Sequence, residues 1–175
     1  DGSYLECQDF WRISGIERDV FIYAQPKTRV RDFEVLSTLD ESYVNGQFSI
    51  DIALQNHTRS KKLLIVDYEL RDASNALVAS ESTSIDLAND SIETVHFEST
   101  IPTVNTWNAE HPYLYTLLLT TADENGELME YIPTKVGFRS VEIKNGLLLL
   151  NGQHITLKGV NAQETDPETG HVMSE

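Results

Sequence analysis

Cysteine is almost absent from this sequence, and long apolar runs and an excess of basic residues are missing as well. Because Cys7 is the single cysteine, the chain has no internal disulfide and no zinc module built from several cysteines. No stretch approaches the roughly 20 apolar residues of a membrane helix, so we expect no membrane partner. With 28 acidic and 13 basic residues, the formal net charge is −15. This charge argues against nucleic acid as a partner, because phosphate contacts need Lys and Arg.

Two further signatures are missing. The start, DGSYLECQDF, has no basic region followed by an apolar region, so it is not a secretion signal. Because it also lacks an initiating Met, we expect an excised piece of a longer chain. The five histidines are scattered and have no companion at metal-ligand spacing, so His171 is not expected to bind a metal.

The composition that remains is that of a globular chain. Apolar residues make up 40% of the 175 residues and charged residues 23%, which is enough apolar material for a packed core. The length fits one domain of ordinary size, or one domain flanked by partial elements of its neighbours.

Alternation of apolar and polar residues with a period of two dominates the middle of the chain. It places Phe48, Ile50, Ile52 and Leu54 on one face of a strand. A second strand places Leu64, Val66, Tyr68 and Leu70 on one face. Turn signals such as VNGQ and DENGE separate further strands, which we predict at about 28–39, 76–84, 92–99, 113–122 and 127–137.

No segment of ten or more residues keeps a helical stripe of apolar positions, so the fold class is all-β. About seven antiparallel strands over roughly 110 residues predict an immunoglobulin-like β-sandwich. Trp107 lies just before a Pro112 turn, and we expect it to pack in the core rather than to stack on a sugar. Asn56 begins an NHT tripeptide, a glycosylation signal short enough to occur by chance.

The two ends of the chain differ from the middle. Residues 1–25 are rich in aromatics and are interpreted as a strand pair from a preceding domain. Near the other end, two Asn-Gly pairs between apolar runs predict hairpins. We expect Leu147–Leu150 to pair with Ile155–Val160 across the second. Apolar surface around Phe21–Tyr23 and Leu147–Val160 is expected to be exposed, and such patches favour weak association between copies.

Several long stretches resemble the bacterial β-galactosidases of glycoside hydrolase family 2: DGSYLECQDFWRISGIERDVFIYAQP, WNAEHPYLY, VGFRSVEIKNGLLLLNGQHITLKGVN and PETGHVMSE. The resemblance implies a three-part organisation. Residues 1–25 would be the last strands of a sugar-binding jelly roll, and 26–137 the immunoglobulin-like domain. Residues 138–175 would be a lead-in hairpin with the first strand of a truncated TIM barrel. The middle of the chain matches only as a generic sandwich.

The resemblance also implies a function for the longer protein, which we call the parent. The parent would hydrolyse terminal non-reducing β-D-galactose residues with retention, using two carboxyl groups about 5 Å apart. In the family both catalytic glutamates come from later barrel strands, beyond Glu175, so the 175-residue chain itself is expected to be inactive. The parent's jelly-roll and barrel domains would be its partners, in a homo-oligomer of the bacterial cytoplasm or periplasm.

Four residues are implied as substrate contacts in the full-length parent: Asp1, Asn161, Gln163 and Glu164. Asp1 matches the family's sodium ligand, and Na⁺ and Mg²⁺ are the ions implied for the parent. Gln163 stands where the family motif has a His, and Ala162 replaces the Arg before it. Gln cannot become cationic as His can, so this difference bears on which sugar the parent recognises. Glu164 and Asp166 form a carboxylate pair, which we interpret as orienting the loop or facing solvent.

Two alternatives stay open at this point. The first assigns the parent to the β-glucuronidases or β-mannosidases of the same family, because Ala162 and Gln163 depart from the galactosidase pattern. The second interprets the chain as a free-standing carbohydrate-binding or adhesion sandwich. An open reading frame continuing into a barrel separates the second alternative from the first.

Overall fold

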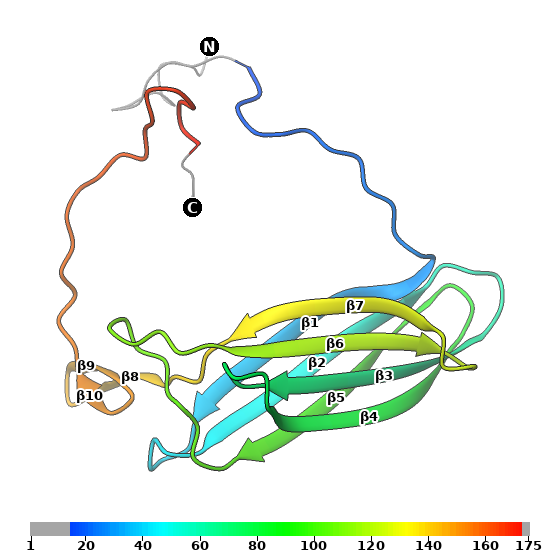
Figure 1. The fold of residues 1–175 in the computed structure, drawn as a ribbon, viewed down its shortest axis with the longest axis horizontal. Helices are drawn as coiled ribbons and strands as arrows, with labels where there is room; N and C mark the ends of the chain where they lie inside the picture. Colours follow the sequence, from blue (N-terminus) through cyan, green and yellow to red (C-terminus); the bar gives the residue numbers. More distant parts are fainter. Residues whose placement is uncertain (1–14, 173–175) are drawn as a thin grey trace. The chain divides into compact units, whose positions relative to one another are not determined.

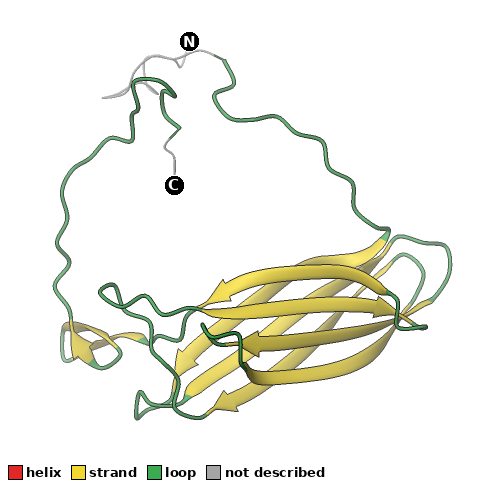
Figure 2. Ribbon diagram, viewed as in Figure 1, coloured by secondary structure: helices red, strands yellow, loops and turns green. Residues whose placement is uncertain are grey.

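Ten β-strands make up the regular structure of the described residues, 15–172, in this computed structural model. Figure 2 shows strands and loops but no helix in that part of the chain. Seven long strands form two antiparallel sheets, ordered β1-β2-β5 and β4-β3-β6-β7 (Figure 1). These strands are β1 (Thr28–Leu39), β2 (Gly46–Asn56), β3 (Lys62–Arg71), β4 (Leu77–Leu87), β5 (Ser91–Ile101), β6 (Tyr115–Asp123) and β7 (Leu128–Val136). The predicted all-β, immunoglobulin-like sandwich is therefore confirmed.

The core between the sheets consists of the side chains that the period-two pattern assigned to one face. All eight predicted inward residues of β2 and β3 are at most 1% exposed. Tyr68 lies at the centre, with its ring 5.2 Å from the rings of Phe48 and Phe97. Full burial of each such apolar side chain contributes roughly 1.5–3 kcal/mol to folding. The alternation thus fixes both the strands and the face that each strand buries.

Aspartates form the turns between strands. Asp40 follows β1 and accepts hydrogen bonds from the Ser42 hydroxyl (2.8 Å), the Val44 amide (3.1 Å) and the Asn45 amide (3.2 Å). The Ser42 hydrogen bond, helped by those of Val44 and Asn45, lowers the pKa of the Asp40 carboxyl to about 2. The turns that begin at Asp72 and Asp123 are built in the same way.

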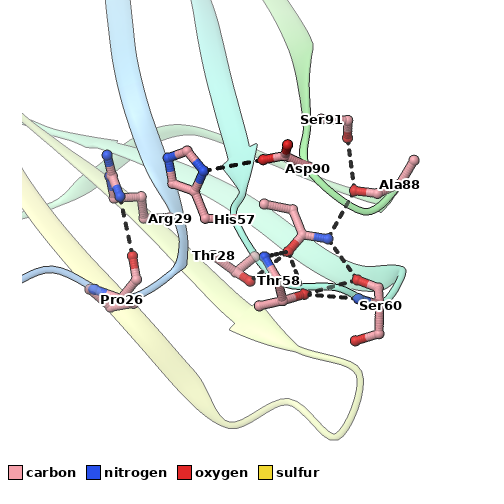
Figure 3. Close-up of polar contacts among 10 residues, drawn as sticks. Pro26, Thr28, Arg29, His57, Thr58, Ser60, Ala88, Asp90 and Ser91 are labelled. Atoms are coloured by element: carbon pink, nitrogen blue, oxygen red, sulfur yellow. Dashed lines mark hydrogen bonds and ion pairs between the residues drawn. The ribbon is translucent and has the colours of Figure 1, made fainter.

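One buried polar group links the loop after β2 to the end of β4, and Figure 3 shows the residues around it. Asn56 is fully buried, and its side-chain amide donates to the carbonyls of Ser60 (2.9 Å), Ala88 (2.9 Å) and Leu87 (3.4 Å). The side-chain oxygen of Asn56, Oδ1, accepts hydrogen bonds from the backbone amide (3.0 Å) and the hydroxyl (2.7 Å) of Thr58. Because the amide nitrogen is buried and used, the NHT tripeptide is a structural motif and offers no accessible acceptor for a glycan.

A short three-stranded meander follows the sandwich, with β8 (Val141–Lys144), β9 (Leu147–Leu150) and β10 (Gln153–His154). Both predicted Asn-Gly hairpins are confirmed. The partner strand predicted for Leu147–Leu150 was wrong, however, because Gln153 and His154 pair with Leu150 and Leu149. A two-residue turn brings the next residues into register at once, so residues 155–160 lie beyond the pairing apart from one Ile155–Leu148 hydrogen bond (3.1 Å).

The chain divides into two compact units. Gln25–Thr156 form one unit, which contains every strand described above, and the segments before and after it form the other. Within the described part, residues 15–25 contain no strand. Phe21, Ile22 and Tyr23 are 75%, 100% and 72% exposed, so the apolar exposure predicted there is confirmed. No helix of residues 15–172 is long and apolar enough to cross a membrane.

Candidate functional site

The implied substrate contacts lie outside the sandwich. Asn161, Gln163 and Glu164 follow one another on the exposed segment after Thr156, and Asp1 falls outside the described residues. The Thr165 amide donates to the Gln163 carbonyl (3.0 Å), which bends the chain directly after these side chains. Their polar groups are therefore open to a ligand, and their role as contacts stays a prediction.

Asp166 organises the loop that follows. Its carboxylate accepts hydrogen bonds from the backbone amides of Glu168 (2.8 Å) and Thr169 (2.9 Å), and both lower the pKa of the carboxyl. Two backbone hydrogen bonds between Asp166 and Gly170 close the turn (2.7 and 2.9 Å). This geometry confirms the interpretation of Asp166 as a residue that orients the loop. Glu164 is exposed, as the same interpretation expects.

His171 contacts the segment before the sandwich. Its Nδ1 lies 3.4 Å from Oε2 of Glu17, and both side chains are about one quarter exposed (26% and 25%). Residues 15–172 contain no group of three His, Cys, Asp or Glu side chains that could hold a metal ion. The ions implied by the resemblance would therefore need ligands from outside the described part of the chain.

A second candidate site holds the meander against the end of the sandwich. We call it the exit joint, because the chain leaves this unit just beyond it. The side-chain amide of Asn151 donates to the Trp107 carbonyl (3.0 Å), and its Oδ1 accepts from the Ser140 amide (2.9 Å). The Asn151 amide returns a hydrogen bond to the Ser140 carbonyl (2.8 Å). The exit joint consists of Tyr43, Trp107, Arg139, Ser140, Glu142, Asn151 and Gly152.

Tyr43 supplies the other half of the exit joint. It adopts a positive φ of 58° in the turn after β1, and its hydroxyl donates a short hydrogen bond to Glu142 of β8. This hydrogen bond raises the pKa of the Tyr43 phenol. A Cβ on Gly152 would lie only 2.5 Å from the Tyr43 ring, so only glycine allows this close approach. The turn after β1 and the meander therefore touch over both polar and apolar atoms.

Trp107 completes the exit joint from the segment between β5 and β6. Its amide donates to the Phe138 carbonyl (2.8 Å), and the Arg139 guanidinium lies 4.7 Å from the centre of its ring. The prediction that Trp107 packs in the core was wrong, since the side chain is half-buried beside Gly137 and outside the core cluster. The Arg139 side chain therefore covers one face of the Trp107 ring just before the meander begins at Val141.

The sequence predicted the Asn-Gly turn at Asn151 but not the hydrogen bonds that the Asn151 side chain makes to Ser140 and Trp107. Turn preference explains the positive φ of Asn151, 51°, and says nothing about which carbonyl its side chain reaches. The Trp107 carbonyl is 44 positions away, and Tyr43 and Glu142 are 99 positions apart. Contacts between residues so far apart depend on how the sheets pack, and short-range patterns carry no signal for them.

Comparison with protein families supports a glycosidase relationship. The family described as glycosyl hydrolases family 2 matches residues 28–139. The chain is 42% identical over 173 residues to a β-galactosidase of Halalkalibacterium halodurans, a match that covers 99% of this chain and 16% of that protein. It is 40% identical over 171 residues to a β-galactosidase of Priestia megaterium, covering 97% and 16%. The chain thus spans about one sixth of the length of these relatives.

Solved structures show the same fold. A β-glucuronidase of Bacteroides uniformis aligns with a TM-score of 0.83 at 19% identity, covering 95% of this chain and 21% of that one. A β-glucuronidase of Parabacteroides merdae aligns with a TM-score of 0.71 at 21% identity, covering 85% and 18%. At such identities the likeness establishes the fold alone.

Proposed function

Because the chain belongs to glycosyl hydrolases family 2, we propose that it is a non-catalytic part of a β-galactosidase. The parent hydrolyses terminal non-reducing β-D-galactose residues with retention of configuration. The observation that carries this proposal is the 42% identity to a β-galactosidase, which extends over 99% of the chain. The two carboxyl groups that such hydrolysis needs come from barrel strands that these residues do not include.

The role of this part is to brace the sugar-binding domain against the catalytic barrel. A brace must fix the direction in which the chain leaves it, and the exit joint does so by contacts from two separate segments to the meander. The turn at Tyr43 and the segment at Trp107 hold the meander, which delivers the chain to Leu157. This anchoring fixes the point at which the chain leaves the sandwich, directly after the meander.

Within the parent, Asp1, Asn161, Gln163 and Glu164 line the sugar pocket. Gln163 both donates and accepts hydrogen bonds and stays neutral, so it recognises a hydroxyl without supplying positive charge. The carboxylate of Asp1 is a hard oxygen donor suited to Na⁺, with further ligands from the barrel. Ligands for Mg²⁺ would likewise come from residues outside the described part of the chain.

Two other functions compete with this proposal. One differs in the sugar that the parent hydrolyses, and the other in whether the sandwich belongs to a longer enzyme. Ala162 and Gln163 replace the Arg-His pair of the galactosidase motif, and this favours a β-glucuronidase or β-mannosidase as the runner-up parent. A free-standing carbohydrate-binding sandwich would need a sugar site of its own on residues 25–156.

The test is an assay of the full-length parent on aryl β-galactoside, β-glucuronide and β-mannoside, with the 175-residue chain assayed beside it. We expect the parent to turn over the galactoside with retention and the short chain to turn over none of the three. Turnover of the glucuronide or mannoside without the galactoside would refute the choice of sugar. Activity of the short chain would refute its non-catalytic role.

A further inference from the structure

The outer face of the meander is apolar, with two exposed side chains on β8 and two half-buried ones on β9. Alternation along β8 turns Glu142 toward Tyr43 of the sandwich, so Val141 and Ile143 point the other way. These two side chains are 61% and 80% exposed. Their cross-strand partners on the same face are Leu150 and Leu148. The exit joint thus leaves four neighbouring apolar side chains on the opposite side of the sheet from its polar contacts.

This face continues into a groove on the sandwich. The groove has a volume of about 520 Å³ and runs between residues 35–38 of β1 and 134–136 of β7, with Trp107, Leu114 and Val141 on its walls. Leu36 in the groove is 54% exposed, and Leu114 is 39% exposed. Val141 belongs to both features, so they form one surface. We call it the exit surface, made of Leu36, Leu114, Lys135, Arg139, Val141, Ile143, Leu148 and Leu150.

The charge on the exit surface is opposite to that of the chain as a whole. The residues that line the groove include Lys135 and Arg139 and, within this described set, no Asp or Glu. The whole chain carries 28 acidic residues against 13 basic ones. The occupant that fits is therefore apolar with at least one carboxylate.

We propose that the exit surface docks a segment of the parent's own chain that lies outside these 175 residues. This inference rests on the proposed function, because it assumes a longer multidomain parent. The relatives are about six times as long, so most of the polypeptide that could cover the surface is missing. A segment tethered close by meets the surface at a high effective concentration, which a second copy in dilute solution does not match. Contiguous exposed apolar groups are the usual mark of such contacts.

Cysteine labelling tests the proposal directly. Val141→Cys and Leu128→Cys form a matched pair, because both native side chains are 61% exposed. Leu128 begins β7, at the end of the strand away from the meander (Figure 1). Each variant is made in a Cys7→Ser background, in the 175-residue chain and in the full-length parent. A neutral maleimide labels the folded proteins, and peptide mass mapping gives the rate at each site.

We expect both cysteines to react at similar rates in the 175-residue chain. In the parent, Val141→Cys should react at least about tenfold more slowly, while Leu128→Cys keeps its rate. Adding Lys135→Glu to the parent should raise the rate at Val141→Cys, because the carboxylate of the docked segment would be repelled. An unchanged rate in this last variant would overturn the assignment of a carboxylate to the occupant.

Equal labelling of Val141→Cys in the two proteins would overturn the docking proposal. Protection that appears in the 175-residue chain as its concentration rises would also overturn it, in favour of a second copy. Both readouts are taken without substrate. A parent that hydrolyses another sugar but protects Val141→Cys from labelling would therefore refute only the proposed function. An active galactosidase in which Val141→Cys is not protected from labelling would refute only this inference.

Discussion

At the scale of single residues, four of the 28 acidic side chains stabilise turns of the backbone. Asp40, Asp72, Asp123 and Asp166 each accept backbone amide hydrogen bonds at the start of a turn. In each case hydrogen bonds to the charged form lower the pKa of the carboxyl. Part of the net charge of −15 is therefore explained by turn formation and needs no acid-specific partner.

Asn56 is the residue whose loss should matter most for stability. Asn56→Ala removes the donor to the carbonyls of Ser60 and Ala88 and the acceptor for Thr58, and the Asn56 side chain itself is fully buried. Buried polar groups left without partners cost about 1–3 kcal/mol each, so we expect the free energy of unfolding to fall by about 3 kcal/mol. Urea denaturation followed by tryptophan fluorescence measures this change.

The control is Asn89→Ala, since Asn89 is exposed in the turn between β4 and β5. Its stability should stay within about 0.5 kcal/mol of the original chain. If the two variants lose the same stability, burial of the Asn56 network is not what stabilises this end of the sandwich.

At the scale of elements, the meander is too small to be stable alone and depends on the exit joint. Asn151→Gly keeps the positive φ of the turn and removes the side chain that bonds Trp107 and Ser140. We expect the amide of Ser140 to exchange with solvent at least about tenfold faster, while the amides of β2 and β3 keep their rates. Hydrogen–deuterium exchange with NMR detection resolves these amides.

Asn145→Gly provides the comparison within the same meander. Asn145 has the same φ, 51°, and its side chain makes no hydrogen bond within residues 15–172. This variant should leave exchange at Ser140 unchanged. Equal acceleration in both variants would mean that backbone preference, and not the Asn151 side chain, holds the meander.

At the scale of the whole molecule, the sandwich and its meander form a unit that should fold without the rest of the chain. All strands and the entire buried core of residues 15–172 lie within Gln25–Thr156. A chain trimmed to residues 25–156 should therefore unfold within about 1 kcal/mol of the 175-residue chain, because domains with their own core are independently stable. Urea unfolding of the two chains side by side gives the difference. A larger loss of stability would show that the outer segments help to hold the sandwich.

Sequence patterns were sufficient for the sandwich itself. Alternation along β2 and β3 identified eight apolar residues that face the core, and the Asn-Gly pairs located both turns of the meander. These features are local, because side-chain direction in a strand and φ in a turn depend on neighbouring residues. The roles of Asp1, Asn161, Gln163 and Glu164 came only from resemblance, and they stay predictions.

Long-range contacts were decided by the tertiary structure alone. The sequence by itself determined which residues face the core, through a period of two, and where the chain turns. It did not determine that Asn56 bonds Ala88, that Asn151 bonds Trp107, or that Trp107 lies beside the meander and outside the core. Those partners meet only when two twisted sheets stack, and each contact depends on the packing of all the others.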